Sequence, residues 1–269
     1  MKLTYLGTAA AEGFPAVFCN CAYCAEARRL GGKNIRTRSQ ALVGDDLLID
    51  LPADTYFHFL REGIEADRIA YLLITHAHAD HLYAKELDNR HPPYGHAMRA
   101  PTLHVYGSAG TRERMGQLPA GVDMTVLAPF ETATVGPYRV TPLPARHMPG
   151  AEPFIYVIEG DRTLLYAHDT GYPTEDVLRF IKERGFVFDM VSLDCTNVDI
   201  PIGDDGHHMG FPNLARLLTA LSDMGAITEQ TVRYVNHFSH NGGPLHEHLT
   251  KRAATIGAHP SYDGCTVVF

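Results

Sequence analysis

Long apolar runs are absent from this 269-residue sequence, and none approaches the roughly 20 residues that a membrane-spanning helix needs. The first residues, MKLTYLGTAAAEG, contain one lysine and a tract of small residues, which is too short an apolar core for a signal peptide. We therefore expect a cytoplasmic protein that does not enter a membrane.

Positive charge is also scarce, because 23 Lys and Arg residues face 31 Asp and Glu residues and the formal net charge is −8. Proteins that bind nucleic acids hold the phosphate backbone with clustered Lys and Arg. The charge argues against a broad nucleic-acid surface. It stays compatible with a small anionic substrate, since bound divalent cations would reduce the negative charge locally.

Cysteine is rare and odd in number, which argues against a disulfide framework. Three of the five cysteines, Cys19, Cys21 and Cys24, lie within six residues. A reducing compartment and a zinc site explain this spacing, because three thiolates so close together can surround one ion. A set of buried thiols is the alternative. Cys195 and Cys265 are alternatives for a fourth zinc ligand, but both lie in apolar strand patterns, where a cysteine behaves as a small hydrophobic residue.

Predicted strands and helices alternate along the whole chain, without a low-complexity linker or a repeat. Continuous apolar runs such as IAYLLITH and FDMVSLDCT predict buried strands, and FPNLARLLTALSDMG predicts an amphipathic helix. The cysteine-bearing stretch after the first strand is interpreted as a loop, and residues 88–125 as the least regular part. We expect one α/β domain spanning residues 1–269, with helices covering a β core.

Four strong metal ligands stand together in ITHAHADHL, residues 74–82: His76, His78, Asp80 and His81. They are too many for one four-coordinate metal that keeps an open position for chemistry. A single histidine beside an apolar strand is more often a satisfied core residue, but this motif taken whole is highly specific for metal.

Three more candidate ligands end other predicted strands: His147, Asp169 and His237. Strand ends hold side chains rigidly at one edge of a sheet, so these residues can meet the first four. The predicted arrangement is two neighbouring metal sites that share Asp169. The first takes His76, His78 and His147, and the second takes Asp80, His81 and His237. Imidazole and carboxylate suit zinc, manganese, iron or cobalt without selecting among them.

The motifs THAHADH and YAHDTG resemble the His-x-His-x-Asp-His signature and the bridging-aspartate segment of the metallo-β-lactamase superfamily. The resemblance extends over nearly the whole chain. It implies an αββα sandwich, in which two sheets pack face to face with helices outside and a dinuclear metal site lies at one edge.

A closer resemblance is to PhnP, the phosphodiesterase family of the carbon–phosphorus lyase pathway that degrades phosphonates. The shared segments are the LGT start, CNCAYC, LDCT, GHHMGFPNL and HFSH. In that family the cysteines and the second histidine of the last motif bind a structural zinc. The resemblance therefore implies a structural zinc held by Cys19, Cys21, Cys24 and His240.

The expected chemistry uses a hydroxide between two divalent ions, zinc or manganese, because bound cations lower the pKa of water. We expect catalytic roles for Asp80 in the metal site and for His208, which matches the non-ligand histidine of the family, as general acid. His207 beside it blurs that assignment. His207 and Arg90, the latter in the irregular segment LDNRHPPYGHAMR, are candidate substrate contacts.

The sequence thus predicts a dinuclear metal-dependent phosphodiesterase acting on a small phosphate diester of a sugar or nucleotide, with cyclic diesters among the candidates. One alternative is a lactonase or thioesterase that uses the same site. Another is a non-catalytic relative such as PqqB of pyrroloquinoline-quinone biosynthesis, whose cysteine loop this sequence also resembles. A tRNA-processing nuclease is disfavoured by the net charge. The expected partner is the small substrate, and the sequence leaves a homodimer open.

Overall fold

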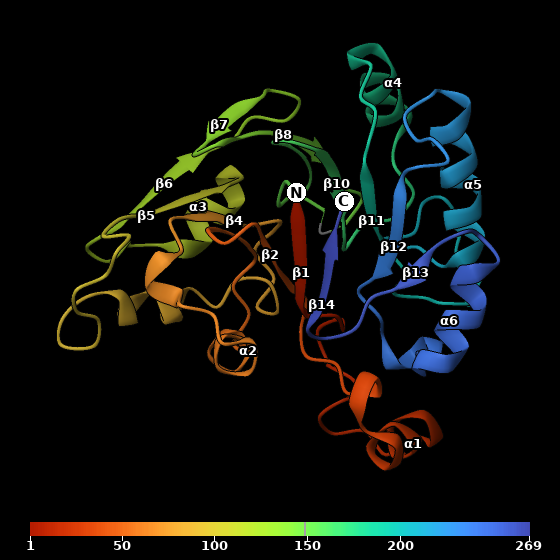
Figure 1. Cartoon of the computed structure of the whole chain (residues 1–269), viewed down its shortest axis with the longest axis horizontal. Coiled ribbons are helices and arrows are strands. Elements are labelled where there is room, and N and C mark those ends of the chain that lie inside the picture. Colours follow the sequence, from red (N-terminus) through yellow and green to blue (C-terminus); the bar gives the residue numbers. More distant parts are fainter. Residues whose placement is uncertain (148) are drawn as a thin grey trace.

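Two mixed β-sheets pack face to face in the computed structural model, which describes residues 1–147 and 149–269 (Figure 1). The first sheet contains, in order, β14 (Cys265–Val268), β1 (Lys2–Gly7), β2 (Gln40–Val43), β3 (Leu47–Ile49), β4 (Tyr71–Leu73), β5 (Leu103–Gly107) and β6 (Val122–Val126). The second contains β13 (His259–Pro260), β12 (Val232–Asn236), β11 (Met190–Asp194), β10 (Thr163–Ala167), β9 (Phe154–Glu159), β8 (Tyr138–Pro144) and β7 (Ala133–Val135).

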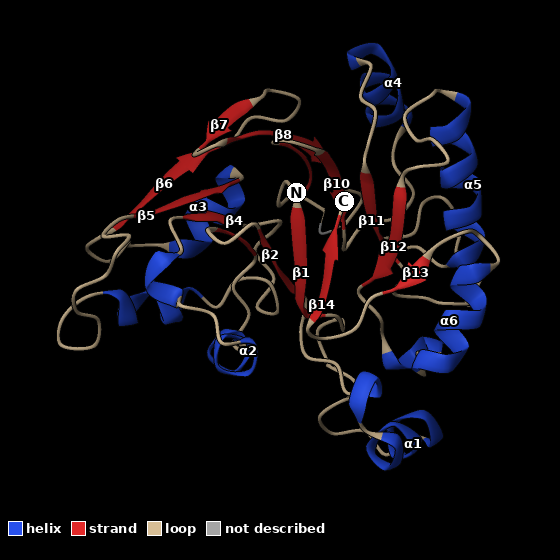
Figure 2. Cartoon of the chain, viewed as in Figure 1, coloured by secondary structure: helices blue, strands red, loops and turns tan. Residues whose placement is uncertain are grey.

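Helices cover the outer faces of both sheets (Figure 2). The helices are α1 (Ala22–Leu30), α2 (Thr55–Glu62), α3 (Ala109–Met115), α4 (Glu175–Arg184), α5 (Phe211–Asp223) and α6 (His246–Ala254), with short 3-10 turns η1 (Gly32–Asn34), η2 (Ala66–Arg68), η3 (Ala84–Arg90) and η4 (His240–Gly242). Figure 1 shows α4, α5 and α6 on the second sheet and α2 and α3 on the first. The αββα sandwich expected from the sequence is confirmed.

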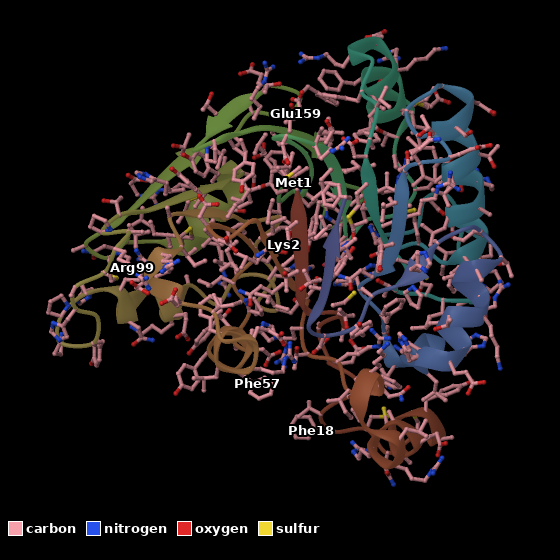
Figure 3. The ribbon with its side chains drawn as sticks, viewed as in Figure 1. Met1, Lys2, Phe18, Phe57, Arg99 and Glu159 are labelled. Carbon is pink, nitrogen blue, oxygen red and sulfur yellow. The ribbon has the colours of Figure 1, made fainter. Side chains whose placement is uncertain are left out.

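Three apolar layers hold the sandwich together, and side chains fill the space between the sheets (Figure 3). The central layer joins the inner faces of the two sheets through residues such as Tyr5, Ile49 and Tyr156, all fully buried. The two outer layers lie under the helices. Since burial of apolar area is the main favourable term in folding, this packing fixes the two sheets relative to each other.

Two expectations about local structure need correction. The cysteine-bearing segment is not all loop, because α1 begins directly after Cys21 with the helix-favouring stretch AYCAEARRL and ends at Gly31. Residues 88–125 contain β5, α3 and most of β6; α3 is capped by the Ser108 side chain, which accepts a hydrogen bond from the Thr111 N–H. Both helices are short, with 9 and 7 residues, and Pro and Gly residues lie near them in the sequence. Apolar residues therefore repeat too few times in either helix to predict it from periodicity.

No helix in the described part of the chain combines the length and the apolar character that crossing a membrane requires.

Candidate metal centre

Four strands end at one edge of the sandwich, and each is followed by predicted ligands. The stretch that begins at His76 follows β4 of the first sheet, whereas His147, Asp169 and His237 follow β8, β10 and β12 of the second. Asp169 and His237 have left-handed backbone, with φ of 54° and 63°, which a non-glycine residue adopts rarely. Strained backbone of this kind persists only where the surrounding structure holds it, and it is concentrated at functional sites.

The first group of ligand atoms comes from His76, His78, His147 and Asp169, and these atoms lie within 4.8 Å of one another. His78 Nδ1 is 2.9 Å from His76 Nε2 and 3.0 Å from His147 Nε2. His76 Nε2 is also 3.1 Å from Asp169 Oδ2. The structure thus brings together the first predicted set and the shared aspartate.

The second group comes from Asp80, His81, Asp169 and His237, again with ligand atoms within 4.8 Å of one another. His81 Nε2 is 3.0 Å from Asp169 Oδ2 and 3.3 Å from both Asp80 Oδ2 and His237 Nε2. Because Asp169 belongs to both groups, the two sets adjoin at one buried carboxylate.

The chemistry of these donors fits divalent cations. Ring nitrogens face one another at about hydrogen-bond distance, so a single proton is the most that each pair can share. Among the described residues, no group forms a hydrogen bond of acceptable geometry with the buried Asp169 Oδ1, although Nδ1 of His208 and of His147 lie 3.1 and 3.3 Å from it. Burial raises the pKa of Asp169, but the neighbouring histidines, His237 first, outweigh it and hold that pKa well below its usual range. An ionised carboxylate with a free oxygen among imidazole nitrogens suits a metal ion.

Further buried residues orient the ligand rings. Asp50 Oδ2 lies 2.7 Å from His81 Nδ1, and Asp50 in turn accepts hydrogen bonds from the N–H and hydroxyl of Thr75. Thr196 Oγ1 lies 2.8 Å from His237 Nδ1. Such contacts leave Nε2 of each ring free to face the shared site. Neither Asp50 nor Thr196 is predicted from the sequence. For Asp50, the one available signal is its place at the end of the apolar run in DDLLID, where a predicted strand ends.

Comparison with known proteins agrees with this geometry. The family model described as the beta-lactamase superfamily domain matches residues 49–235. The chain belongs to the metallo-β-lactamase superfamily. No curated protein matches the sequence.

Several solved structures share the fold over nearly their full length. A new diphosphatase from the PhnP family has a TM-score of 0.76 at 22% identity, over 100% of this chain and 97% of the other. Zinc-bound PqqB from Methylobacterium extorquens has a TM-score of 0.74 at 19% identity, over 100% of both chains. YhfI from Bacillus subtilis, a metallo-β-lactamase fold protein, has a TM-score of 0.72 at 18% identity, over 99% of both. These TM-scores establish a common fold. Membership of the superfamily implies that the chain binds divalent metal.

His208 lies beside the shared aspartate of the superfamily site, with Nδ1 3.1 Å from Asp169 Oδ1. It also contacts Asp194, a fully buried residue at the end of β11. Burial disfavours the charged ring, but the hydrogen bond to Asp194 and its charge outweigh this and raise the pKa of His208 to about 9. His207 is exposed, and its backbone carbonyl oxygen lies 3.3 Å from His147 Nδ1. The two neighbours therefore have different surroundings, and His208 is the one held at the carboxylates.

A cavity of about 360 Å³ opens over both ligand groups and is lined by His208 as well. Arg90, expected as a substrate contact, is not among the residues that line it. Its Nη2 donates to the Ala100 carbonyl oxygen at 2.7 Å, and the side chain lines a separate cavity under α2 and η3. Arg90 is the last residue of η3, and the structure places its side chain at that separate cavity, outside the one over the metal centre.

A further group joins Asp169 and His237 to Asp194 and His208, with ligand atoms within 4.8 Å of one another. The cysteine cluster forms a separate group, in which ligand atoms of Cys19, Cys21, Cys24 and His240 lie within 4.8 Å of one another. His240 Nδ1 is 3.6 Å from Cys24 Sγ and 3.9 Å from Cys21 Sγ. The backbone N–H of Cys24 and the ring of His240 lower the pKa of the Cys21 thiol to about 6. A thiolate is the form that binds zinc, so the structure assembles a donor set suited to that ion.

Proposed function

We propose that the protein is a metal-dependent phosphodiesterase that hydrolyses a small phosphate diester, with cyclic diesters of a sugar or nucleotide included. The observation that carries this proposal is the pair of ligand groups sharing Asp169, with the protonatable His208 beside them. Two adjoining cation sites and a separate proton donor match the needs of phosphoryl transfer to water.

The proposed ligands divide between two ions. His76, His78, His147 and Asp169 would hold one, and Asp80, His81, His237 and Asp169 the other. Bound there, two divalent ions would supply a water of lowered pKa and positive charge for the phosphoryl oxygens. The cysteine cluster, Cys19, Cys21, Cys24 and His240, would hold a structural zinc.

The residues of the chain carry out the remaining steps. Asp50 and Thr196 fix the rings of His81 and His237. His208 faces the cavity and donates its proton to the departing oxygen, which an alkoxide leaving group requires. The carboxylate of Asp194 favours the protonated ring before the reaction.

A second candidate keeps the site and changes the substrate to a lactone or thioester. One observation favours it: within the described residues, neither Lys nor Arg lines the cavity, as an uncharged substrate would allow. A non-catalytic role like that considered for PqqB-like proteins fits less well, because all seven predicted ligands come together here.

A substrate panel separates these candidates. Protein loaded with zinc or manganese is assayed with ribonucleoside 2′,3′-cyclic phosphates, bis(p-nitrophenyl) phosphate, a γ-lactone and a thioester, with His76→Ala as the matched control. We expect diester hydrolysis by the unchanged protein and its loss in His76→Ala. Turnover of the lactone or thioester alone would favour the second candidate. Lack of any turnover by protein that holds its metals would favour a non-catalytic role.

A further inference from the structure

We propose that the enzyme takes diesters whose remainder, outside the scissile phosphate, is uncharged and hydroxylated, and that it discriminates against a second phosphate group. This inference rests on the proposed phosphodiesterase function and names its substrate class. The observations that carry it concern the wall of the cavity around the metal centre.

The cavity wall beyond the ligands and His208 is neutral or negative. Its polar residues are Glu12, Thr196, Asn197, Ser239 and Asn241. Across the part of the chain that the structure describes, no Lys or Arg joins them. Proteins that recognise a terminal phosphate place Arg, Lys or a helix N-terminus against it, and this wall offers no such cation.

Two arginines near the wall are already engaged elsewhere. Arg38 donates from Nε to the Ala11 carbonyl oxygen at 2.8 Å and forms an ion pair with Asp54 at 3.1 Å. Arg146 donates from Nε to the Tyr172 carbonyl oxygen at 3.2 Å. Both guanidinium groups therefore have partners within the protein, and neither arginine is among the residues that line the cavity.

Glu12 places a fixed negative charge on the wall. Its Oε1 accepts hydrogen bonds from Ser239 Oγ at 2.6 Å and from the His240 N–H at 3.1 Å. The carboxylate is thus anchored between the loop after β1 and the loop after β12. A dianionic group placed beside it would meet like charge, whereas a hydroxyl group could donate to it.

Two side-chain amides on the cavity wall can bind hydroxyl groups of a substrate. Asn197 and Asn241 line the cavity, and neither side chain has a hydrogen-bond partner among the described residues. Each amide offers both donors and an acceptor, which is the pairing that sugar hydroxyls need. Together with Glu12, they form a wall that matches a polyol better than an anion.

The test uses two substrates that differ only in the second phosphate: cytidine 2′,3′-cyclic phosphate with and without a 5′-phosphate. For the metal-loaded protein we expect kcat/KM to be at least roughly tenfold higher for the compound without it. Glu12→Gln keeps the acceptor for Ser239 and His240 while removing the charge. It should reduce that preference by roughly threefold or more, chiefly by raising kcat/KM for the 5′-phosphorylated compound.

Arg114→Ala is the matched control, because Arg114 lines a neighbouring hollow that shares His78 with the cavity, and Arg114 is not part of the proposed wall. The substrate preference should not change in this variant. Equal rates, or a preference for the 5′-phosphorylated compound, would overturn the inference. If that reversed preference vanished in Arg114→Ala, the second phosphate would bind in the neighbouring hollow.

Failure of the inference and failure of the proposed function are distinguishable. Hydrolysis of neither compound would count against the phosphodiesterase proposal. Calorimetry would then compare binding of cytidine 3′-phosphate and cytidine 3′,5′-bisphosphate to the metal-loaded protein. Tighter binding of the bisphosphate would overturn the inference about the wall, and weaker binding would support it.

Discussion

His208 Nδ1 lies 3.3 Å from Asp194 Oδ2, and this contact joins a cavity-facing ring to a carboxylate with no exposure to solvent. Asp194 also accepts hydrogen bonds from the backbone N–H groups of Asp169, Thr196 and Met209. One side chain therefore fixes the loops after β10 and β11 and the segment before α5. The position of His208 relative to Asp169 follows from that arrangement.

Replacing His208 with Ala should lower kcat by roughly 10²- to 10⁴-fold while metal content stays unchanged, because a general acid is lost and no ligand is removed. The loss should be smaller for p-nitrophenyl diesters, whose leaving group departs without a proton. Steady-state kinetics on alkyl and p-nitrophenyl diesters, with elemental analysis of each variant, measures both effects.

Three results would contradict this role. Loss of a metal in His208→Ala would make His208 a ligand. Equal losses for good and poor leaving groups would indicate phosphate binding instead of proton donation. Full activity in His208→Ala, together with loss in His207→Ala, would move the role to the neighbouring residue.

Purified protein should contain three tightly bound metal ions per chain, two in the groups that share Asp169 and one in the cysteine cluster. The donor sets differ, so a thiolate cluster should retain zinc while the other two sites accept zinc or manganese. Elemental analysis after growth in metal-supplemented medium gives the count. One ion or none would count heavily against this arrangement.

Asp169→Asn should weaken metal binding at the second group by at least about tenfold, because it removes the negative charge that both groups share and replaces one of the two carboxylate oxygens with an NH2 group. Competition with a chelator measures the affinity. Thr170→Val alters the neighbouring residue without removing a ligand and serves as the control. Unchanged affinity in Asp169→Asn would exclude the shared-carboxylate arrangement.

Cys21→Ser should lower the free energy of unfolding by about 2 kcal/mol or more, because a structural zinc contributes directly to folding. His240→Ala should give the same effect in milder form, with KM changed less than stability. Zinc content and melting temperature are the measurements. Cys265→Ala, which changes a buried cysteine outside the cluster, should keep its zinc. If Cys21→Ser retained both its zinc and its melting temperature, the three cysteines would be ordinary thiols and not a structural zinc site.

Acid should destabilise the protein through His246, whose Nδ1 lies 3.3 Å from Arg36 Nη2. Burial, followed by the charges of Arg36 and Lys33, lowers the pKa of His246 from 6.5 to about 4. Its neutral form therefore stabilises the fold above about pH 6.5, and that contribution is lost as the pH falls toward 4. Because the ring is partly exposed, we expect about 1 kcal/mol between pH 7 and pH 5.

Urea unfolding of the unchanged protein and of His246→Gln at several pH values tests this prediction. The variant should lose less stability than the unchanged protein over this interval. An identical pH dependence in the two proteins would show that protonation of His246 does not contribute.

The structure brings the seven predicted ligand side chains together, and each of these residues has a local signal in the sequence. His76, His78, Asp80 and His81 share one short motif, and His147, Asp169 and His237 each follow an apolar strand. The strands end at one edge of the sandwich, and this alignment brings the ligands from separate segments together.

The supporting residues have no comparable signal. Asp50, Asp194 and Glu12 are single acids whose importance depends on which segments the fold places beside them. Arg90 lies close in sequence to the ligand motif, but its side chain donates to the Ala100 carbonyl oxygen and lines a separate cavity. Contacts between distant segments are set by tertiary packing, which a local pattern does not encode.

The cysteine cluster also has a consequence for the order of events during synthesis. Cys24 and His240 are separated by 216 residues, so the fourth donor is made long after the thiols. At roughly 5 to 20 residues per second, the interval is on the order of 10 to 40 s. During this time the three thiols can react with oxidants or capture other ions before His240 is available. The nascent chain therefore passes through a period of chemical vulnerability that the folded protein no longer has.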